Sequence, residues 1–179
     1  MSRVMNGGGA FFTIGHSNRE LDEFLQMLTE HRIETVVDVR KLAGSRRYPR
    51  FNADNLAGVL ASRGIELARF EGLTGRRPVS KTVPFETNAW WQNRSFHNYA
   101  LSAEFAEALQ GLLDLGHETR MAIMCAEAVW WRCHRCIIAD YLLAAGEQVR
   151  HLLGPGSAIS AQMSEGAVLA RATVIYPAV

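Results

Sequence analysis

Groups suited to acid, base and nucleophilic chemistry gather in one short stretch of the chain, Cys125-Ala-Glu127 followed by Cys133-His134-Arg135. A thiol at the start of a helix and close to arginines tends to ionise, and a thiolate is a nucleophile. His134 or His16 could accept the thiol proton, and Glu127 could orient that histidine or act as an acid or base. The stretch therefore predicts a reactive cysteine at Cys125 or Cys133.

Three other interpretations of the cysteines stay open. Cysteine is often buried as plain packing, which is the interpretation we favour for Cys136 beside Ile137. The three cysteines and a histidine could hold zinc, but their spacing matches no standard finger, so we predict no metal. Cys125 and Cys133 could also form a reversible disulfide across the loop between them.

The segment from Arg40 to Arg50 carries five cationic side chains and no acid. Arginine binds phosphate or carboxylate through two parallel hydrogen bonds, so an anionic group is the natural ligand. We expect Arg40, Arg46 and Arg47 to hold such an anion together with Arg135. A solvated basic loop is the alternative.

Asp38 ends an apolar run, and His16 follows another. The Asp38 carboxylate could orient His16 or an arginine, or act as a general base if its pKa is raised. It could equally form a structural salt bridge with Arg40 or Arg46.

Tryptophans occur in two pairs, Trp90-Trp91 and Trp130-Trp131, both in expected loops. Paired tryptophans near arginines could stack on a base or a sugar ring, and Trp130 is our candidate for that role. A hydrophobic plug that closes the long loop over the site is the alternative. Polar groups of Ser95-Phe-His97-Asn-Tyr99 could line the same rim.

Alternating strand and helix patterns predict the elements that position these residues. Expected strands cover 10–14, 35–39, 65–70, 120–125, 148–152 and 173–176. Expected helices cover 21–28, capped by Ser17 or Asn18; 54–62; 103–113, capped by Ser102; and 133–145. Residues 72–98 are expected to form a long functional or mobile loop, and Gly154-Pro155-Gly156 a turn. The pattern predicts an α/β domain with a mostly parallel sheet and helices on both faces.

Ligands of open α/β sheets bind beyond the carboxyl ends of the strands. This rule selects the loops after the expected strands 10–14, 35–39 and 120–125, which carry His16, Asp38 and Cys125. We therefore expect these three loops to converge on one site.

Composition bounds the function. The chain has 179 residues, is 48% hydrophobic and 21% charged, and carries a net charge of +1. It has neither a transmembrane stretch nor a signal peptide, and three cysteines make no secreted disulfide framework. We expect a cytoplasmic protein with a flexible leader at 1–10 and one domain at 11–179. The balanced charge argues against general nucleic-acid binding but leaves room for a local patch.

Ordered blocks along the chain resemble the domain of unknown function 488 family. The blocks are Thr13-Ile-Gly-His-Ser17, Val37-Asp-Val-Arg40, Ser45-Arg-Arg-Tyr-Pro-Arg-Phe51, Ser95-Phe-His-Asn-Tyr-Ala100, Met124-Cys-Ala-Glu127 and Cys133-His-Arg135. The resemblance implies a compact bacterial α/β domain without an established biochemistry. It adds Ser45 and Pro49 to the motif residues His16, Asp38, Arg40, Arg46, Cys125, Glu127, Cys133, His134 and Arg135. Many relatives carry a proline where this chain has Val129-Trp130-Trp131.

The layout is also similar to that of rhodanese-like and cysteine-phosphatase domains. The segment between Cys125 and Arg132 is bulky and lacks glycine, so a tight phosphate cradle is not expected. We predict an enzyme, a hydrolase or transferase, that uses the Cys, Glu, His and Arg groups on a phosphorylated or nucleotide-like substrate, with no cofactor. The alternative is a non-catalytic module that binds a nucleotide or nucleic acid, and a purely structural interaction domain is a third interpretation.

Overall fold

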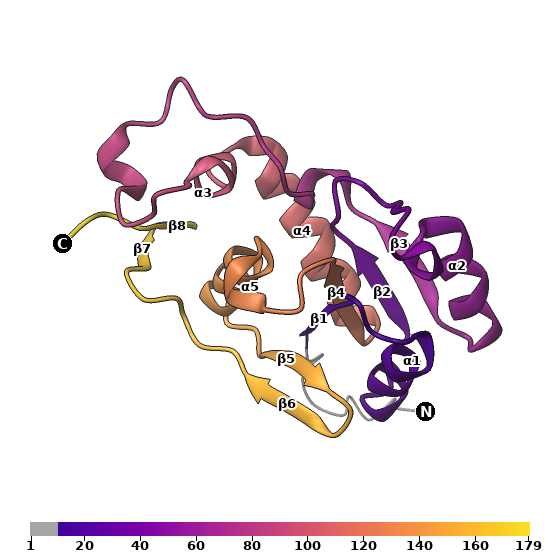
Figure 1. The fold of residues 1–179 in the computed structure, drawn as a ribbon. Helices are drawn as coiled ribbons and strands as arrows, with labels where there is room; N and C mark the ends of the chain where they lie inside the picture. The colour runs from indigo at the N-terminus through magenta and orange to yellow at the C-terminus, as the bar shows by residue number, and fades with distance from the viewer. Residues whose placement is uncertain (1–10) are drawn as a thin grey trace, which may run out of the picture.

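Residues 11–179, the part of the chain that the computed structural model describes, are built around a six-stranded sheet (Figure 1). The strand order is β3-β2-β4-β1-β5-β6, and β6 alone in this sheet runs antiparallel to its neighbour. The strands are β1 (Phe11–Gly15), β2 (Thr35–Asp38), β3 (Glu66–Arg69), β4 (Met121–Cys125), β5 (Val149–Gly154) and β6 (Ser157–Ser160). The prediction of an α/β fold with a mostly parallel sheet is confirmed. The expected leader at 1–10 lies outside the described residues.

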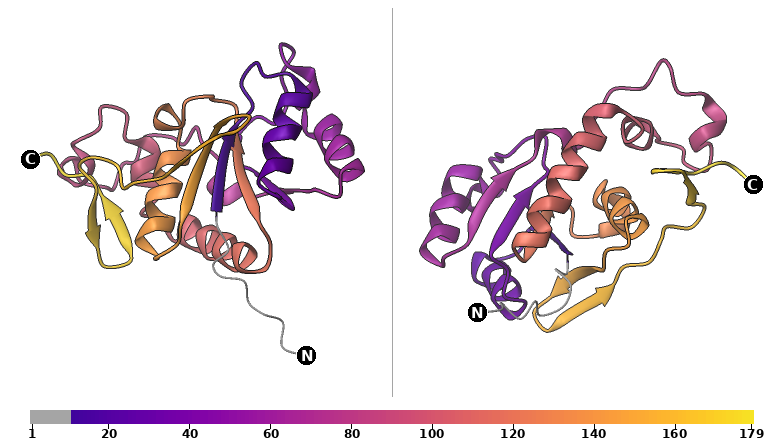
Figure 2. Two further views of the ribbon diagram at one scale, coloured as in Figure 1. Left: turned by 90° about the horizontal axis from the view of Figure 1, so that it is seen from below. Right: turned by 180° about the vertical axis from the view of Figure 1, so that it is seen from behind.

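Helices cover both faces of the sheet (Figure 2). One face packs against α1 (Leu21–Glu30) and α2 (Ala53–Ser62), and the other against α4 (Ala103–Glu118) and α5 (Arg135–Ala144). Successive side chains of a strand point to opposite faces, so Phe12 packs with α1 whereas Phe11 belongs to the α4–α5 core. β1 and β4 are buried along their whole lengths for this reason.

The expected cap of the first helix is wrong. α1 begins at Leu21 with Glu20 at its N-cap position, and no side chain caps it. The amide of Ser17 instead donates to the carbonyl of Ala126 at 2.9 Å, and Ser17 adopts a φ of 45°. The chain after β1 is therefore held against the loop after β4 before the helix can start. Ser102 caps α4 as predicted, with its Oγ accepting from the Phe105 amide at 3.2 Å.

The tail contains two strands that the sequence analysis missed and one that it predicted. After the turn at Pro155-Gly156, β6 pairs antiparallel with β5, and Gly156 supplies a φ of 68°. Farther on, β7 (Val168–Ala170) pairs with β8 (Thr173–Ile175) in a separate two-stranded sheet. The strand expected at 173–176 is therefore present as β8. The missed strands β6 and β7 are short and have no buried alternating pattern, so pairing defines them and periodicity does not.

The long segment after β3 is not a continuous loop. It contains two 3₁₀ turns, Glu71–Leu73 and Phe85–Asn88, and the short helix α3 (Ser95–Tyr99). Tyr99 ties α3 back to the chain by donating its hydroxyl to the Gly72 carbonyl at 2.6 Å. Along residues 11–179, no helix has the length and apolar character needed to cross a lipid bilayer.

Candidate functional site

The carboxyl ends of β1, β2 and β4 meet at one edge of the sheet. Gly15 is paired with Cys125, and Asp38 with Met124. Pairing continues past the strands, because the amide of His16 donates to the Cys125 carbonyl at 3.0 Å. A Cβ at position 15 would collide with the carbonyl of Glu127, so only glycine lets the two loops come this close. The structure therefore brings the three predicted loops together.

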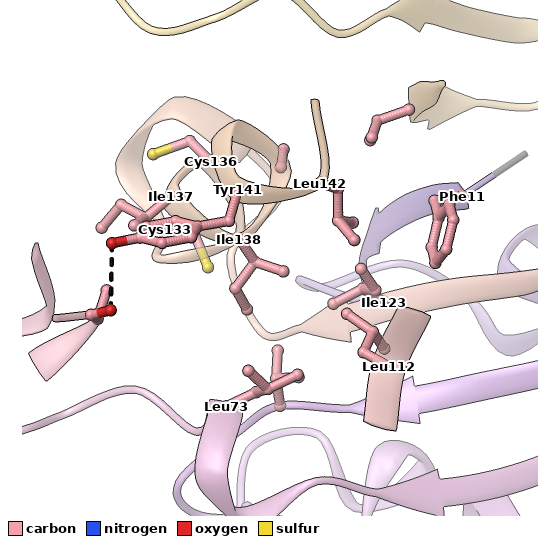
Figure 3. Packing of buried hydrophobic residues seen from close by; sticks show 14 of the residues in the cluster. Phe11, Leu73, Leu112, Ile123, Cys133, Cys136, Ile137, Ile138, Tyr141 and Leu142 are labelled. Atoms are coloured by element: carbon pink, nitrogen blue, oxygen red, sulfur yellow. Dashed lines mark hydrogen bonds between the residues drawn. The ribbon is translucent and has the colours of Figure 1, made fainter. Parts of the chain in front are cut away.

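Cys125 and Cys133 lie against each other at the centre of this edge. Their Sγ atoms are 2.6 Å apart, both are free thiols, and both are buried. Cys125 ends β4, whereas Cys133 precedes α5 and follows the 3₁₀ turn Trp130–Arg132. Figure 3 shows Cys133 among buried side chains of the α4–α5 core, with the Cys136 sulfur in a separate position.

His134 is the histidine that contacts the pair. Its Nδ1 lies 3.5 Å from Cys133 Sγ, and its Nε2 lies 3.0 Å from the carbonyl oxygen of Val39. A carbonyl can only accept, so Nε2 carries a proton and Nδ1 of the neutral ring is free to take one from Cys133. The backbone after β2 thus fixes the orientation that proton transfer requires.

Charge is distributed unequally over the two thiols. A hydrogen bond from Cys125, assisted by His134 and Arg135, lowers the pKa of the Cys133 thiol. Burial, followed by that same hydrogen bond, raises the pKa of the Cys125 thiol. Of the two thiols, Cys133 is therefore the one whose ionisation these neighbours favour.

Arg135, expected as an anion ligand, is instead buried behind the cysteines. Only 1% of it is exposed, and its Nη2 donates to the Glu127 carbonyl at 2.6 Å. Its positive charge helps to lower the pKa of the Cys133 thiol, and it borders neither cavity described below. The Glu127 carboxylate is exposed and, within residues 11–179, makes no hydrogen bond or ion pair, so it remains available as an acid or base.

Asp38, Arg40 and His16 form a second buried cluster. Arg40 donates from Nε and Nη2 to the Asp38 carboxylate at 2.9 and 2.8 Å, and from Nη1 to the Phe51 carbonyl at 2.8 Å. His16 stacks on Phe51, and its Nε2 lies 3.3 Å from Arg40 Nη1. Burial lowers the pKa of His16 to about 4, so its ring is neutral. The cluster anchors the chain after β2, which carries the carbonyl that orients His134.

Two cavities lie beside Cys133. The larger cavity, about 480 Å³, is bordered by Arg76, Arg77 and Arg132, and also by Glu127. The smaller cavity, about 170 Å³, is bordered by Arg40 and Arg76 and reaches both cysteines. Cys133 and His134 border both. Cys133 therefore lies at the wall of a pocket whose cationic side chains favour an anion.

The far wall of the larger cavity holds polar atoms without partners. Trp91 Nε1 and both ring nitrogens of His97 are buried and make no hydrogen bond within the described part of the chain. The two rings stack on each other with centroids 5.0 Å apart. Buried polar atoms are nearly always hydrogen-bonded in native proteins, so this wall is suited to a polar ligand or to water.

Other predicted residues do not line the cavities beside Cys133. Ser45, Arg46 and Arg47 border neither cavity, and the Ser45 hydroxyl accepts from the Arg47 amide at 3.1 Å within its own loop. Trp130 stacks on His151 with centroids 4.3 Å apart and also borders neither cavity.

Arg76 and Arg77 are site residues that the sequence analysis missed. They belong to the long segment after β3, where the signal was the run Gly75-Arg76-Arg77. Arg76 has a φ of 56°, in the left-handed region that non-glycine residues rarely occupy. Between residues 11 and 179, no group of three or more His, Cys, Asp or Glu side chains is arranged to hold a metal ion.

The fold and this edge define a three-layer α/β protein with a buried cysteine pair beyond its parallel strands. Residues 20–142 match the family model described as Domain of unknown function DUF488. The match covers more than half of the 179 residues, so the chain belongs to this family. Comparison with curated proteins finds no match, and comparison with solved structures finds none either.

Proposed function

We propose that this protein is a cysteine-dependent enzyme, a hydrolase or transferase, that acts on a small anionic substrate. The observation that carries the proposal is the position of the Cys133 sulfur, 2.6 Å from Cys125 Sγ and 3.5 Å from His134 Nδ1, at the wall of an arginine-bordered cavity. A thiolate held by such neighbours is a nucleophile at neutral pH.

Cys133 is the nucleophile of this reaction. Its thiolate attacks the electrophilic atom of the substrate, a new bond to sulfur forms, and the leaving group departs with the bonding electron pair. His134 takes or returns a proton at Nδ1, because its Nε2 proton is held by the Val39 carbonyl. Glu127 is the second candidate for proton transfer, since its carboxylate borders both cavities.

Arg76, Arg77 and Arg132 are the proposed anion ligands. Of the three, Arg132 is the most available to bind an anion, because it is exposed and has no ion pair in residues 11–179. Arg77 is partly committed, with its Nε donating to the Thr74 carbonyl at 2.8 Å. Arg40 acts as a positioning residue, because Asp38 and Phe51 occupy its guanidinium.

The test is the alkylation rate of each cysteine against pH, mapped by mass spectrometry on the native protein. We expect Cys133 to react with iodoacetamide well below pH 8.5, the approximate pKa of a free thiol, and His134→Gln to move this midpoint upward. His117→Gln changes an exposed histidine on α4 and is the matched control. If His134→Gln leaves the midpoint of Cys133 alkylation unchanged, His134 is not the proton partner of Cys133.

Anion binding is tested with the same reaction. We expect anionic iodoacetate to be favoured over neutral iodoacetamide in the wild type, and Arg132→Gln to reduce this preference. Arg63→Gln, which removes an exposed arginine at the end of α2, is the control. If Cys133 reacts only at high pH and shows no preference for iodoacetate, the proposed function is wrong.

A further inference from the structure

Cys125 forms no bond to substrate in the reaction proposed above, yet its sulfur lies in direct contact with the sulfur of the nucleophile. The two Sγ atoms are 2.6 Å apart, and eight positions of chain separate the residues. Cys125 ends β4 and Cys133 precedes α5, so sheet and helix hold both in place. A group bound to Cys133 through sulfur would lie within immediate reach of this second thiol.

We infer that Cys125 and Cys133 form a dithiol–disulfide couple that reduces a small anionic disulfide. The inference rests on the proposed function for the identity of the nucleophile and names the substrate class. It assigns Cys125 the role of the resolving thiol.

The reaction has two exchange steps. The Cys133 thiolate attacks one sulfur of the substrate, the substrate S–S bond breaks, and half of the substrate leaves as a thiolate. Cys125 then attacks the Cys133 sulfur of the mixed disulfide, and its proton goes to the second leaving thiolate. The protein dithiol is oxidised to the Cys125–Cys133 disulfide, and the substrate is reduced to one thiolate and one thiol. An added dithiol then reduces the Cys125–Cys133 disulfide by two further exchanges, is itself oxidised to a disulfide, and so restores the starting pair.

The cavities provide room on the two sides that these steps need. Cys133 borders both cavities, whereas Cys125 borders only the smaller. A substrate half attached to Cys133 therefore occupies the larger cavity, and Cys125 attacks from the other side. Attack and departure along one line through the central sulfur is the favoured geometry of thiol–disulfide exchange.

Charge selects the substrate. Arg76, Arg77 and Arg132 border the larger cavity, and Arg135 lies buried behind the cysteines. Carboxylates on the substrate would pair with the three bordering arginines. Glutathione disulfide, with a net negative charge, is a suitable probe, and cystamine, with a net positive charge, is its counterpart.

The experiment treats the reduced full-length chain with glutathione disulfide, quenches with acid, and maps the cysteines by mass spectrometry. Wild type should become lighter by two hydrogens, with a Cys125–Cys133 disulfide and no retained glutathione. Cys125→Ser should retain glutathione on Cys133. Cys133→Ser should neither form a disulfide nor retain glutathione. Cys136 stays reduced throughout and is the internal control, because burial raises the pKa of its thiol to about 12.

Oxidation by glutathione disulfide should be about tenfold faster than by cystamine, and added salt should reduce this ratio. Arg132→Gln should reduce the ratio too, whereas Arg63→Gln should leave it unchanged. A ratio unaffected by salt and by Arg132→Gln would overturn the assignment of an anionic substrate.

Failure of this inference and failure of the proposed function give different results. If Cys133 alkylates as a thiolate but wild type retains glutathione, or does not react with it, the dithiol couple is wrong and the nucleophile stands. If Cys133 is not activated towards iodoacetamide, the proposed function falls as well. The wild-type product alone decides the point should Cys125→Ser fail to fold.

Discussion

The pKa of the Cys133 thiol is lowered by neighbours that come from separate parts of the chain. Cys125 donates from the end of β4, His134 is the next residue, and Arg135 brings buried positive charge from the first turn of α5. His134 is oriented in turn by the Val39 carbonyl beyond β2. The pKa of this one thiol therefore depends on the packing of two strands and a helix.

Gly75 provides the sharpest test at the scale of a residue. A Cβ there would lie 2.8 Å from His134 Nδ1, so Gly75→Ala must displace the imidazole. We expect the alkylation midpoint of Cys133 to rise, because a displaced ring no longer stabilises the thiolate, and stability to fall by about 1–3 kcal/mol from overpacking. Cysteine alkylation against pH and urea unfolding measure the two effects.

Gly58→Ala is the matched control for this substitution. Position 58 lies inside α2, and a Cβ there meets no atom within 4 Å. Alanine in a helix is more stable than glycine by about 0.5–1 kcal/mol, so this variant should gain stability and keep the Cys133 profile. An unchanged midpoint in Gly75→Ala would mean that the His134 ring does not govern the thiolate.

At the scale of elements, α4 supports the sheet without contributing a residue that we assign to the reaction. Its start depends on the Ser102 side chain, which accepts from the Phe105 amide at 3.2 Å. We expect Ser102→Ala to lower stability by about 1 kcal/mol and to leave Cys133 alkylation unchanged. Urea unfolding provides the measurement.

Ser62→Ala is the comparison for the cap. Ser62 is exposed at the end of α2, and its hydroxyl donates to the Val59 carbonyl, so its removal should change stability by less than about 0.5 kcal/mol. Equal losses in the two variants would contradict a specific capping role for Ser102.

An element could be predicted when its own residue pattern defines it, and could not when contacts with distant residues define it. α5 was evident because Ile137, Ile138, Tyr141 and Leu142 repeat at helical spacing, and all four are buried. β6 carries no such pattern and exists because β5 offers it an unpaired edge. The start of α1 was misjudged because the Ser17 amide bonds to Ala126, a partner more than a hundred positions away.

At the scale of the whole molecule, three buried histidines make stability depend on pH. Burial lowers the pKa of His16, His97 and His151 from 6.5 to about 4. Each folded pKa lies below its unfolded value, so the unfolded chain binds protons first as pH falls. Their stabilisation is complete above pH 6.5 and is lost as pH falls towards 4, at about 3 kcal/mol per ring.

Urea unfolding between these two pH values measures this loss. His97→Phe should reduce the slope, because it removes one titrating ring from between Trp91 and Tyr176. A stability that does not change across this window would contradict neutral, buried imidazoles.

The sequence alone was sufficient for the α/β class, the parallel strands and the loops that carry reactive side chains. Burial periodicity, turn residues and strand-end chemistry are local properties, so a single chain reveals them. The same local reasoning pointed to Cys125, Cys133, His134 and Glu127 without ranking the two thiols.

Only the tertiary structure decided how those residues are placed relative to one another. It buried Arg135 behind the thiols, placed Arg76 and Arg77 at the larger cavity, and brought the Val39 carbonyl to His134. These relations join segments tens of residues apart, and strand register and core packing set their distances. Ionisation depends on such distances and on burial, which is why the two thiols could be distinguished only in the folded molecule.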